Sequence, residues 1–199
     1  MIFGDFASWT NRGSRPLQFF EDFYKEIEVR LRDADPISLD AVFKMFIHAQ
    51  QRNRKVILGG NGGSAAIASH VSVDLTKAAR VRSICFNESD LITCFANDYG
   101  YEHWLAKAIE CYGDAGDAVV LISSSGRSLN IVNAARSAKE RGLTVVTMSG
   151  FDASNPLRAL GDQNLWVNSR SYNIVETVHQ IWLLACVDKI ALQLQGINR

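Results

Sequence analysis

The stretch Val56-Ile57-Leu58-Gly59-Gly60-Asn61-Gly62-Gly63-Ser64 decides the fold of this chain. Its apolar beginning is typical of a buried strand, and the glycines that follow it open a helix. Glycine lets the backbone approach a ligand closely, and the start of a helix offers unpaired N–H groups at the positive end of its dipole. The stretch therefore predicts an anion site, above all for phosphate, at the end of a strand.

A second loop repeats this arrangement with hydroxyl groups, in Leu121-Ile122-Ser123-Ser124-Ser125-Gly126-Arg127-Ser128. Two such loops, each after a strand, predict one small phosphorylated ligand held from two sides, because ligands of open parallel sheets bind at the carboxyl ends of the strands. Ser64 and Ser128 are also expected to cap the helices that follow. The alternative is that all these serines serve only as helix caps and turn residues.

Around the two loops, short apolar runs alternate with longer helical ones. Strands alternating with helices predict parallel pairing with right-handed crossovers, and continuously apolar strands predict a sheet covered on both faces. Strands are expected at 55–58, 83–86, 118–122, 144–148 and 164–167, and helices at 17–32, 38–52, 64–79, 89–97, 101–111, 128–141 and 172–194.

Composition excludes several classes of protein. The chain has 199 residues, 47% of them hydrophobic, and a formal net charge of zero, so a single domain without the basic face of a nucleic-acid-binding protein is expected. No apolar run is long enough to span a membrane, and the N-terminus lacks the pattern of a signal peptide. Four scattered cysteines without a C-x-x-C pair predict buried free thiols in a reducing cytoplasm.

Nucleotide sites explain the glycine loop less well. The run from Gly60 to Ala65 fits a loose form of the dinucleotide fingerprint, but Glu88 lies farther along the chain than the usual acidic partner, and the serine loop stays unexplained. A P-loop is excluded because no Gly-Lys-Ser/Thr follows the glycines. No nucleotide cofactor is therefore expected.

Four motifs in order resemble the sugar isomerase (SIS) domain, and within it the phosphoheptose isomerase branch. They are Gly60-Asn61-Gly62-Gly63-Ser64-Ala65-Ala66, His70, Ala96-Asn97-Asp98-Tyr99-Gly100-Tyr101, and Ile122-Ser123-Ser124-Ser125-Gly126-Arg127-Ser128, and the resemblance covers about residues 40–195. It implies a three-layer α/β/α, flavodoxin-like domain, here with a five-stranded parallel sheet. The whole chain is then one SIS domain, with an arm and helices at 1–53 used in oligomerisation and an α/β core at 54–199.

The resemblance also implies a function and a set of contacts. Members of the branch form homotetramers, with N-terminal helices packing between subunits, and isomerise sedoheptulose 7-phosphate to the aldose. Asn97 and Asp98 would lie near the sugar hydroxyls, and Arg127 would either face the phosphate or point outward. The positions that carry over as phosphate and sugar contacts are Asn61, Gly62, Ser64, Ser123, Ser124, Ser125 and Ser128.

The catalytic groups depart from the resembled pattern. Aldose–ketose isomerisation needs a base for a C–H proton and an acid or metal for the oxygen. In the branch, one helix supplies His and, four residues later, Glu, and the last helix supplies Gln and, eight residues later, His. Here the first pair is His70 and Asp74, while Glu176 and Leu184 stand at the second pair of positions. His179, one turn before Leu184, is expected to be a packed interface histidine.

Two interpretations follow from these departures. In the first, the site is rearranged: Asp74 is the favoured base, His70 and Glu176 are acid partners or metal ligands, and all three form a site for zinc or another divalent cation. In the second, the proton-shuttling histidine is lost, and the protein binds a sugar phosphate or a partner without turnover, as do relatives that associate with the replication initiator protein. A sugar-phosphate-sensing regulator is a third function, against which the lack of a recognisable DNA-binding segment counts.

Overall fold

The computed structural model describes residues 16–196, and at its centre five strands pair in parallel in the order β2-β1-β3-β4-β5. This is the strand order of the flavodoxin-like fold, so the predicted fold class is confirmed. The strands are β1 (Lys55–Gly60), β2 (Arg82–Cys85), β3 (Ala118–Ser123), β4 (Thr144–Ser149) and β5 (Gln163–Trp166).

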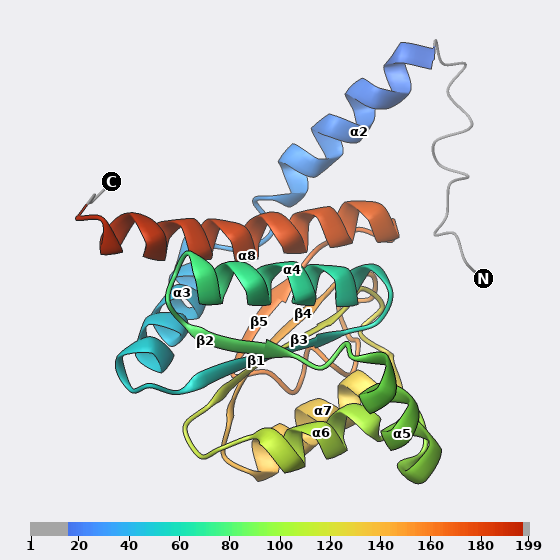
Figure 1. Ribbon diagram of the computed structural model, residues 1–199. Helices are drawn as coiled ribbons and strands as arrows, with labels where there is room; N and C mark the ends of the chain where they lie inside the picture. The colour runs from blue at the N-terminus through green and yellow to red at the C-terminus, as the bar shows by residue number, and fades with distance from the viewer. Residues whose placement is uncertain (1–15, 197–199) are drawn as a thin grey trace.

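Helices cover both faces of the sheet, which gives the three predicted layers (Figure 1). The bounds of all these elements agree with the sequence predictions to within a few residues, as expected where propensity and pattern point to the same structure. The helices are α2 (Pro16–Arg30), α3 (Pro36–Gln51), α4 (Gly63–Lys77), α5 (Ser89–Tyr99), α6 (Trp104–Tyr112), α7 (Leu129–Glu140) and α8 (Tyr172–Leu194).

The strands are apolar throughout because each of their faces meets a helical layer. In β1, Val56 and Leu58 pack in the cluster beneath α3, α4 and α8, whereas Ile57 packs in the cluster beneath α6 and α7. Successive side chains of a strand point to opposite faces, so a sheet with two cores needs apolar residues at every position. The two layers hold the carboxyl ends of β1 and β3 side by side.

The long helix α8 lies on the sheet beside α4, and its middle is buried. His179 has no exposed surface, and its Nε2–H donates to the Ser149 carbonyl at 3.1 Å. Burial disfavours the imidazolium and lowers the pKa of His179 to about 4. His179 is thus a packed residue, as expected, but it packs inside the subunit's own core.

The prediction for the cysteines is confirmed in part. The four cysteines are free, but only Cys186 is buried, and Cys94 and Cys111 are exposed; the prediction of buried thiols is wrong for these two because they occupy the solvent faces of α5 and α6.

Helix α2 extends away from the sheet (Figure 1), while residues 1–15 of the predicted oligomerisation arm lie outside the described part of the chain. Within residues 16–196, no helix has both the length and the apolar character to cross a membrane.

Candidate active site

The glycine loop joins β1 to α4 and leaves the start of that helix open. Gly62 is the N-cap residue, with φ of 55° in the left-handed region, and α4 begins at Gly63 without a side-chain cap. The prediction that Ser64 caps this helix is wrong, because Ser64 lies inside the first turn and its hydroxyl faces the Glu176 carboxylate at 3.5 Å. An uncapped helix start keeps N–H donors available to a ligand.

Gly63 allows α8 to reach this helix start. A Cβ atom at position 63 would lie 2.2 Å from Oε2 of Glu176, so any larger residue would displace the carboxyl group. The close contact explains why a glycine stands at the first position of α4. It also brings a side chain from residue 176 to a loop more than a hundred residues earlier in the chain.

The serine loop has the same form after β3. Ser128 is the N-cap residue of α7 as predicted, but it makes no capping bond; its hydroxyl accepts from the Ser123 hydroxyl at 3.1 Å. Gly126 turns the loop with φ of 63°. The Ser124 hydroxyl is buried without a hydrogen-bond partner, and a group buried in that way carries a free-energy cost unless a ligand pairs with it.

Asn61 is held in place by two residues to which the sequence analysis assigned no role. Its side-chain amide exchanges two hydrogen bonds with that of Asn130, at 2.9 and 2.8 Å, and Tyr101 donates to its Oδ1 at 3.2 Å. Asn130 is almost fully buried, so the reciprocal pair fixes the Asn61 amide at the mouth of the loop.

The two loops enclose a cavity of about 420 Å³, which we call the loop cavity. Its lining brings together the seven residues predicted to contact phosphate and sugar, along with residues of α8. It is lined by Asn61, Gly62, Gly63, Ser64, Ile122, Ser123, Ser124, Ser125, Ser128, Tyr172 and Glu176.

Three other predicted residues lie outside this lining. Asn97 and Asp98 are exposed near the end of α5, where the amide of one donates to the carboxylate of the other at 3.0 Å. Arg127 points outward and pairs with Asp152 at 2.9 Å, which decides between the two orientations expected for it. The cation is thus held away from the loop cavity, so hydroxyl and N–H groups provide its donors.

A second space of about 510 Å³, the helix cavity, adjoins the first between α4 and α8. Gly63 and Glu176 line both cavities, and Glu176 is the one carboxylate among the lining residues of either. The helix cavity is lined by Gly63, Ala66, Ile67, His70, Asn173, Glu176, Thr177 and Gln180.

His70 has a polar partner on each ring nitrogen. Its Nε2 lies 3.2 Å from Oδ2 of Asp74, one turn later in α4, and its Nδ1 lies 3.0 Å from Nε2 of Gln180 in α8. His70 and Gln180 line the helix cavity, but Asp74 lines neither cavity. Asp74, the predicted base, therefore contacts a residue that lines the helix cavity but does not line the cavity itself.

Glu176 has the electrostatics of a proton-transfer group. Burial raises the pKa of its carboxyl group, an effect that the hydroxyl and backbone of Ser64 oppose only in part. Ser124 adds a weaker favourable electrostatic contact without forming a regular hydrogen bond. A carboxyl group with a raised pKa can exchange a proton with substrate closer to neutral pH.

The predicted three-ligand metal centre does not fit this geometry. Within residues 16–196, no three His, Cys, Asp or Glu side chains gather closely enough to hold a metal ion. Glu176 turns toward Ser64 while His70 engages Asp74 and Gln180, so the three proposed ligands do not converge. Leu184, at the position of the family's last-helix histidine, packs half-buried against the core and supplies no ligand.

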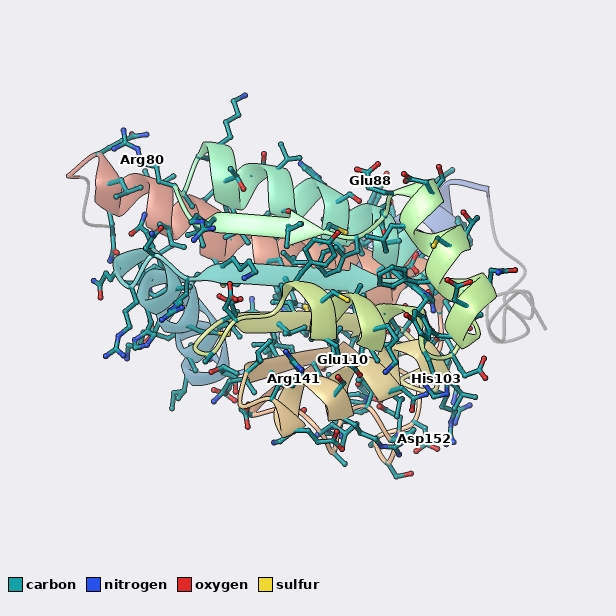
Figure 2. All side chains as sticks on the ribbon, turned by 60° about the horizontal axis from the view of Figure 1, so that its bottom comes forward. Arg80, Glu88, His103, Glu110, Arg141 and Asp152 are labelled. Atoms are coloured by element: carbon teal, nitrogen blue, oxygen red, sulfur yellow. The ribbon has the colours of Figure 1, made fainter. Side chains whose placement is uncertain are left out.

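Three further residues considered for the site, Glu88, His103 and Arg80, are labelled in Figure 2. Glu88 is an exposed N-cap residue of α5, and His103 is an exposed residue that precedes the first turn of α6. Arg80 lies at the opposite end of the sheet from both (Figure 2). None of the three is among the lining residues of the two cavities.

The sequence reasoning missed Gln180, Asn130 and Tyr101. Gln180 had a readable signal, since it follows Glu176 by four residues and shares its helix face. Asn130 and Tyr101 had none, because their hydrogen bonds to Asn61 span 69 and 40 residues of sequence.

The comparison with protein families and the comparison with individual proteins point to the same family. Residues 18–150 match the model of the SIS domain. The phosphoheptose isomerase of Bradyrhizobium sp. strain BTAi1 is 35% identical over 142 residues, which are 67% of this chain and 70% of the relative. That of Shewanella sp. strain W3-18-1 is 30% identical over 180 residues, 85% of this chain and 91% of the relative.

A solved structure extends the similarity to three dimensions. The phosphoheptose isomerase of Neisseria gonorrhoeae superimposes with a TM-score of 0.80 at 25% identity, over 87% of this chain and 96% of that one. The similarity in three dimensions therefore extends over most of this chain and nearly all of that one.

Proposed function

Since the chain belongs to the SIS-domain family, in its phosphoheptose isomerase branch, we propose that it isomerises sedoheptulose 7-phosphate or a close analogue between ketose and aldose. The observation that carries this proposal is the loop cavity, in which two uncapped helix starts and a buried, unpaired hydroxyl face one space. These are the donors that a phosphate dianion needs, and they surround it without a cation.

The phosphate anchors the substrate so that its carbonyl end reaches Glu176. The carboxylate of Glu176 takes the C–H proton beside the carbonyl, which leaves an enediol, and returns the proton to the neighbouring carbon. The proton of one oxygen moves to the other, for which His70, backed by Asp74, is available as the second ionisable residue that lines the helix cavity. No atom is gained or lost, as an isomerisation requires.

This assignment gives Glu176 the role of base that the sequence suggested for Asp74. Glu176 is supported by its place in the lining of both cavities and by its raised pKa. Asp74 lines neither cavity, and its contact with His70 supports a role in orienting that imidazole.

The test is isomerisation in deuterated water. Protein incubated with sedoheptulose 7-phosphate is followed by proton NMR, and we expect the aldose to appear and deuterium to enter at the reacting carbons. The same experiment is run on E176Q, and E88Q is its matched control, because Glu88 is an exposed glutamate that lines neither cavity. Absence of both product and deuterium exchange in the unaltered protein contradicts the proposal.

A non-catalytic binding protein is the alternative, and Leu184 is the observation that favours it. An apolar residue stands where the branch has its last-helix histidine, and it is packed against the core. A protein of that kind binds the sugar phosphate in calorimetry and leaves every C–H bond unexchanged. The NMR experiment above therefore separates the two functions.

We further propose that the protein works as a homotetramer in the cytoplasm. Phe20 and Tyr24 are 53% and 64% exposed on α2, the helix that extends from the sheet (Figure 1). An apolar groove of about 580 Å³ lies between α3 and α8 and offers a surface for a second copy. Light scattering tests the assembly, and a monomer at micromolar concentration contradicts it.

A further inference from the structure

Gln180 is a polar residue of the helix cavity to which the resemblance assigns no role. It stands four residues after Glu176 in α8 and four before Leu184, so the three positions follow one another along one stripe of the helix. Its side-chain amide contacts Nδ1 of His70 at 3.0 Å, across the cavity from its own helix.

The hydrogen bonds of His70 determine where its proton lies. An ionised carboxylate only accepts hydrogen bonds, so the Asp74 contact at 3.2 Å requires a hydrogen on Nε2 of His70. In the neutral ring, Nδ1 then carries a lone pair and needs a donor. The Gln180 NH₂ group is that donor, and its amide must be oriented with the nitrogen toward His70.

From this geometry we infer that Gln180 is a positioning residue, which fixes His70 as the Nε2–H tautomer with its basic Nδ1 turned toward the helix cavity. Its catalytic meaning rests on the isomerase function proposed above. The arrangement follows the logic of a His–Asp pair, in which the carboxylate takes one N–H so that the other nitrogen is free to accept a proton.

A purely structural role for the contact is disfavoured by its surroundings. The His70 side chain is 50% exposed and that of Asp74 35%, so this hydrogen bond is open to water, where such contacts add little to stability. The role that we assign to these contacts is orientation. Asp74 and Gln180, one at each ring nitrogen, fix the direction of the His70 imidazole. Because Gln180 is neutral, a substrate oxygen can take its place at Nδ1 without leaving a charge unpaired.

The relation to Leu184 explains why the residue matters in this chain. With leucine at the position of the last-helix histidine, His70 is the one histidine that lines either described cavity. Its tautomer then decides which of the two ring nitrogens is the basic one. Gln180 lies on the same stripe of α8 as Leu184 and determines the tautomer of His70 through its hydrogen bond to Nδ1.

The test uses the full-length protein labelled with ¹⁵N and the near-isosteric variant Q180M, since methionine keeps the length of the side chain and removes the donor. Correlation spectra of the imidazole nitrogens are recorded at pH about 8.5, where a free imidazole is neutral, and the His70 signals are assigned by their loss in H70N. Q193M is the matched control, because Gln193 is an exposed glutamine of the same helix outside both cavities.

We expect the Nε2–H tautomer to predominate in the unaltered protein and in Q193M, and a mixture of tautomers in Q180M. We also expect Q180M to lose about tenfold in kcat with little change in KM, as for a small misplacement of a reacting group. An Nδ1–H tautomer in the unaltered protein, an unchanged spectrum in Q180M, or an unchanged kcat despite a changed spectrum overturns the inference. A protein that turns over nothing refutes the isomerase proposal, while the spectra still decide the tautomer assignment.

Discussion

The loop cavity and the helix cavity share Gly63 and Glu176, yet they are built in different ways. In the loop cavity, most of the donors come from two short segments that directly follow β1 and β3, and many are backbone groups or serine hydroxyls. In the helix cavity, the functional side chains come from α4 and α8, and His70 meets Gln180 across 110 residues of sequence.

The difference shows that anion binding and proton transfer place separate demands on a sequence. A phosphate is met by generic donors wherever a strand turns into a helix, so its site is local and readable. Proton transfer depends on a few side chains whose distances and pKa values are set by tertiary packing. In the resemblance described above, the loop motifs of this chain match the branch, and the departures at Asp74, Glu176 and Leu184 lie in the two helices.

The largest difference between catalysis and phosphate binding is expected for E176Q. The amide cannot take a proton, so kcat should fall by about 100-fold or more, whereas binding of inorganic phosphate, titrated by ³¹P NMR, should be retained or tightened because a negative charge leaves the shared wall. D74N should lower kcat by about tenfold, the cost of a mispositioned His70. A larger loss in D74N than in E176Q would return the role of base to Asp74.

G126A tests whether the loop cavity depends on its backbone. A Cβ atom there would lie 1.9 Å from Oδ1 of the buried Asn155, in a residue whose φ is 63°. We expect about 2 kcal/mol of lost stability in urea unfolding, together with weaker phosphate binding and no specific effect on His70 spectra. G142A is the control, because Gly142 has φ of 71° and open space around it; equal phosphate affinity in the two variants would contradict this view of the loop.

S124A tests the unpaired hydroxyl of the loop cavity. Removing Ser124 Oγ should weaken phosphate binding by about tenfold, the worth of one hydrogen bond to a charged group. Stability should not fall, because a buried polar atom without a partner is removed. S72A, at a buried serine of α4 outside both cavities, should leave phosphate affinity unchanged; an equal loss there would show that the effect of S124A is indirect.

The smallest expected effect is the change in stability with pH that is caused by Glu176, which lines both cavities. The pKa of Glu176 is raised from 4.5, so between that value and the folded pKa the unfolded chain is ionised while the folded protein is still protonated. Ionisation is less favourable in the fold, and Glu176 therefore lowers the free energy of unfolding progressively as pH rises through this window. The stability difference between E176Q and the unaltered protein, measured in urea from pH 4 to 7, should move in favour of E176Q; parallel curves would contradict the raised pKa.

Most of the fold was predictable because local signals agreed with one another. The Val56–Gly63 region carries an apolar strand, a glycine turn and a helix start in one stretch, and each signal predicts the same βα unit. Errors arose at single residues. Ser64 was expected to cap α4, but the helix begins one residue earlier and Ser64 faces Glu176 instead.

The helix cavity was predictable only in part. His70 and Asp74 were correctly expected to share a helix face, because four-residue spacing fixes that geometry. Their convergence with Glu176 on a metal was wrong for this structure, since α8 presents Gln180 to His70 and directs Glu176 to the start of α4. Which residue of a long helix reaches a distant partner depends on the rotation and height at which it packs.

The sequence by itself determined the parallel sheet, the two loops after β1 and β3, and the hydroxyl-rich lining of the loop cavity, because these follow from residues that are neighbours in the chain. Only the tertiary structure decided that Arg127 turns to Asp152, that Asn130 locks Asn61, and that Glu176 joins the two cavities. Those outcomes depend on contacts between distant segments, whose geometry is fixed when helices settle on the sheet and bury their apolar faces.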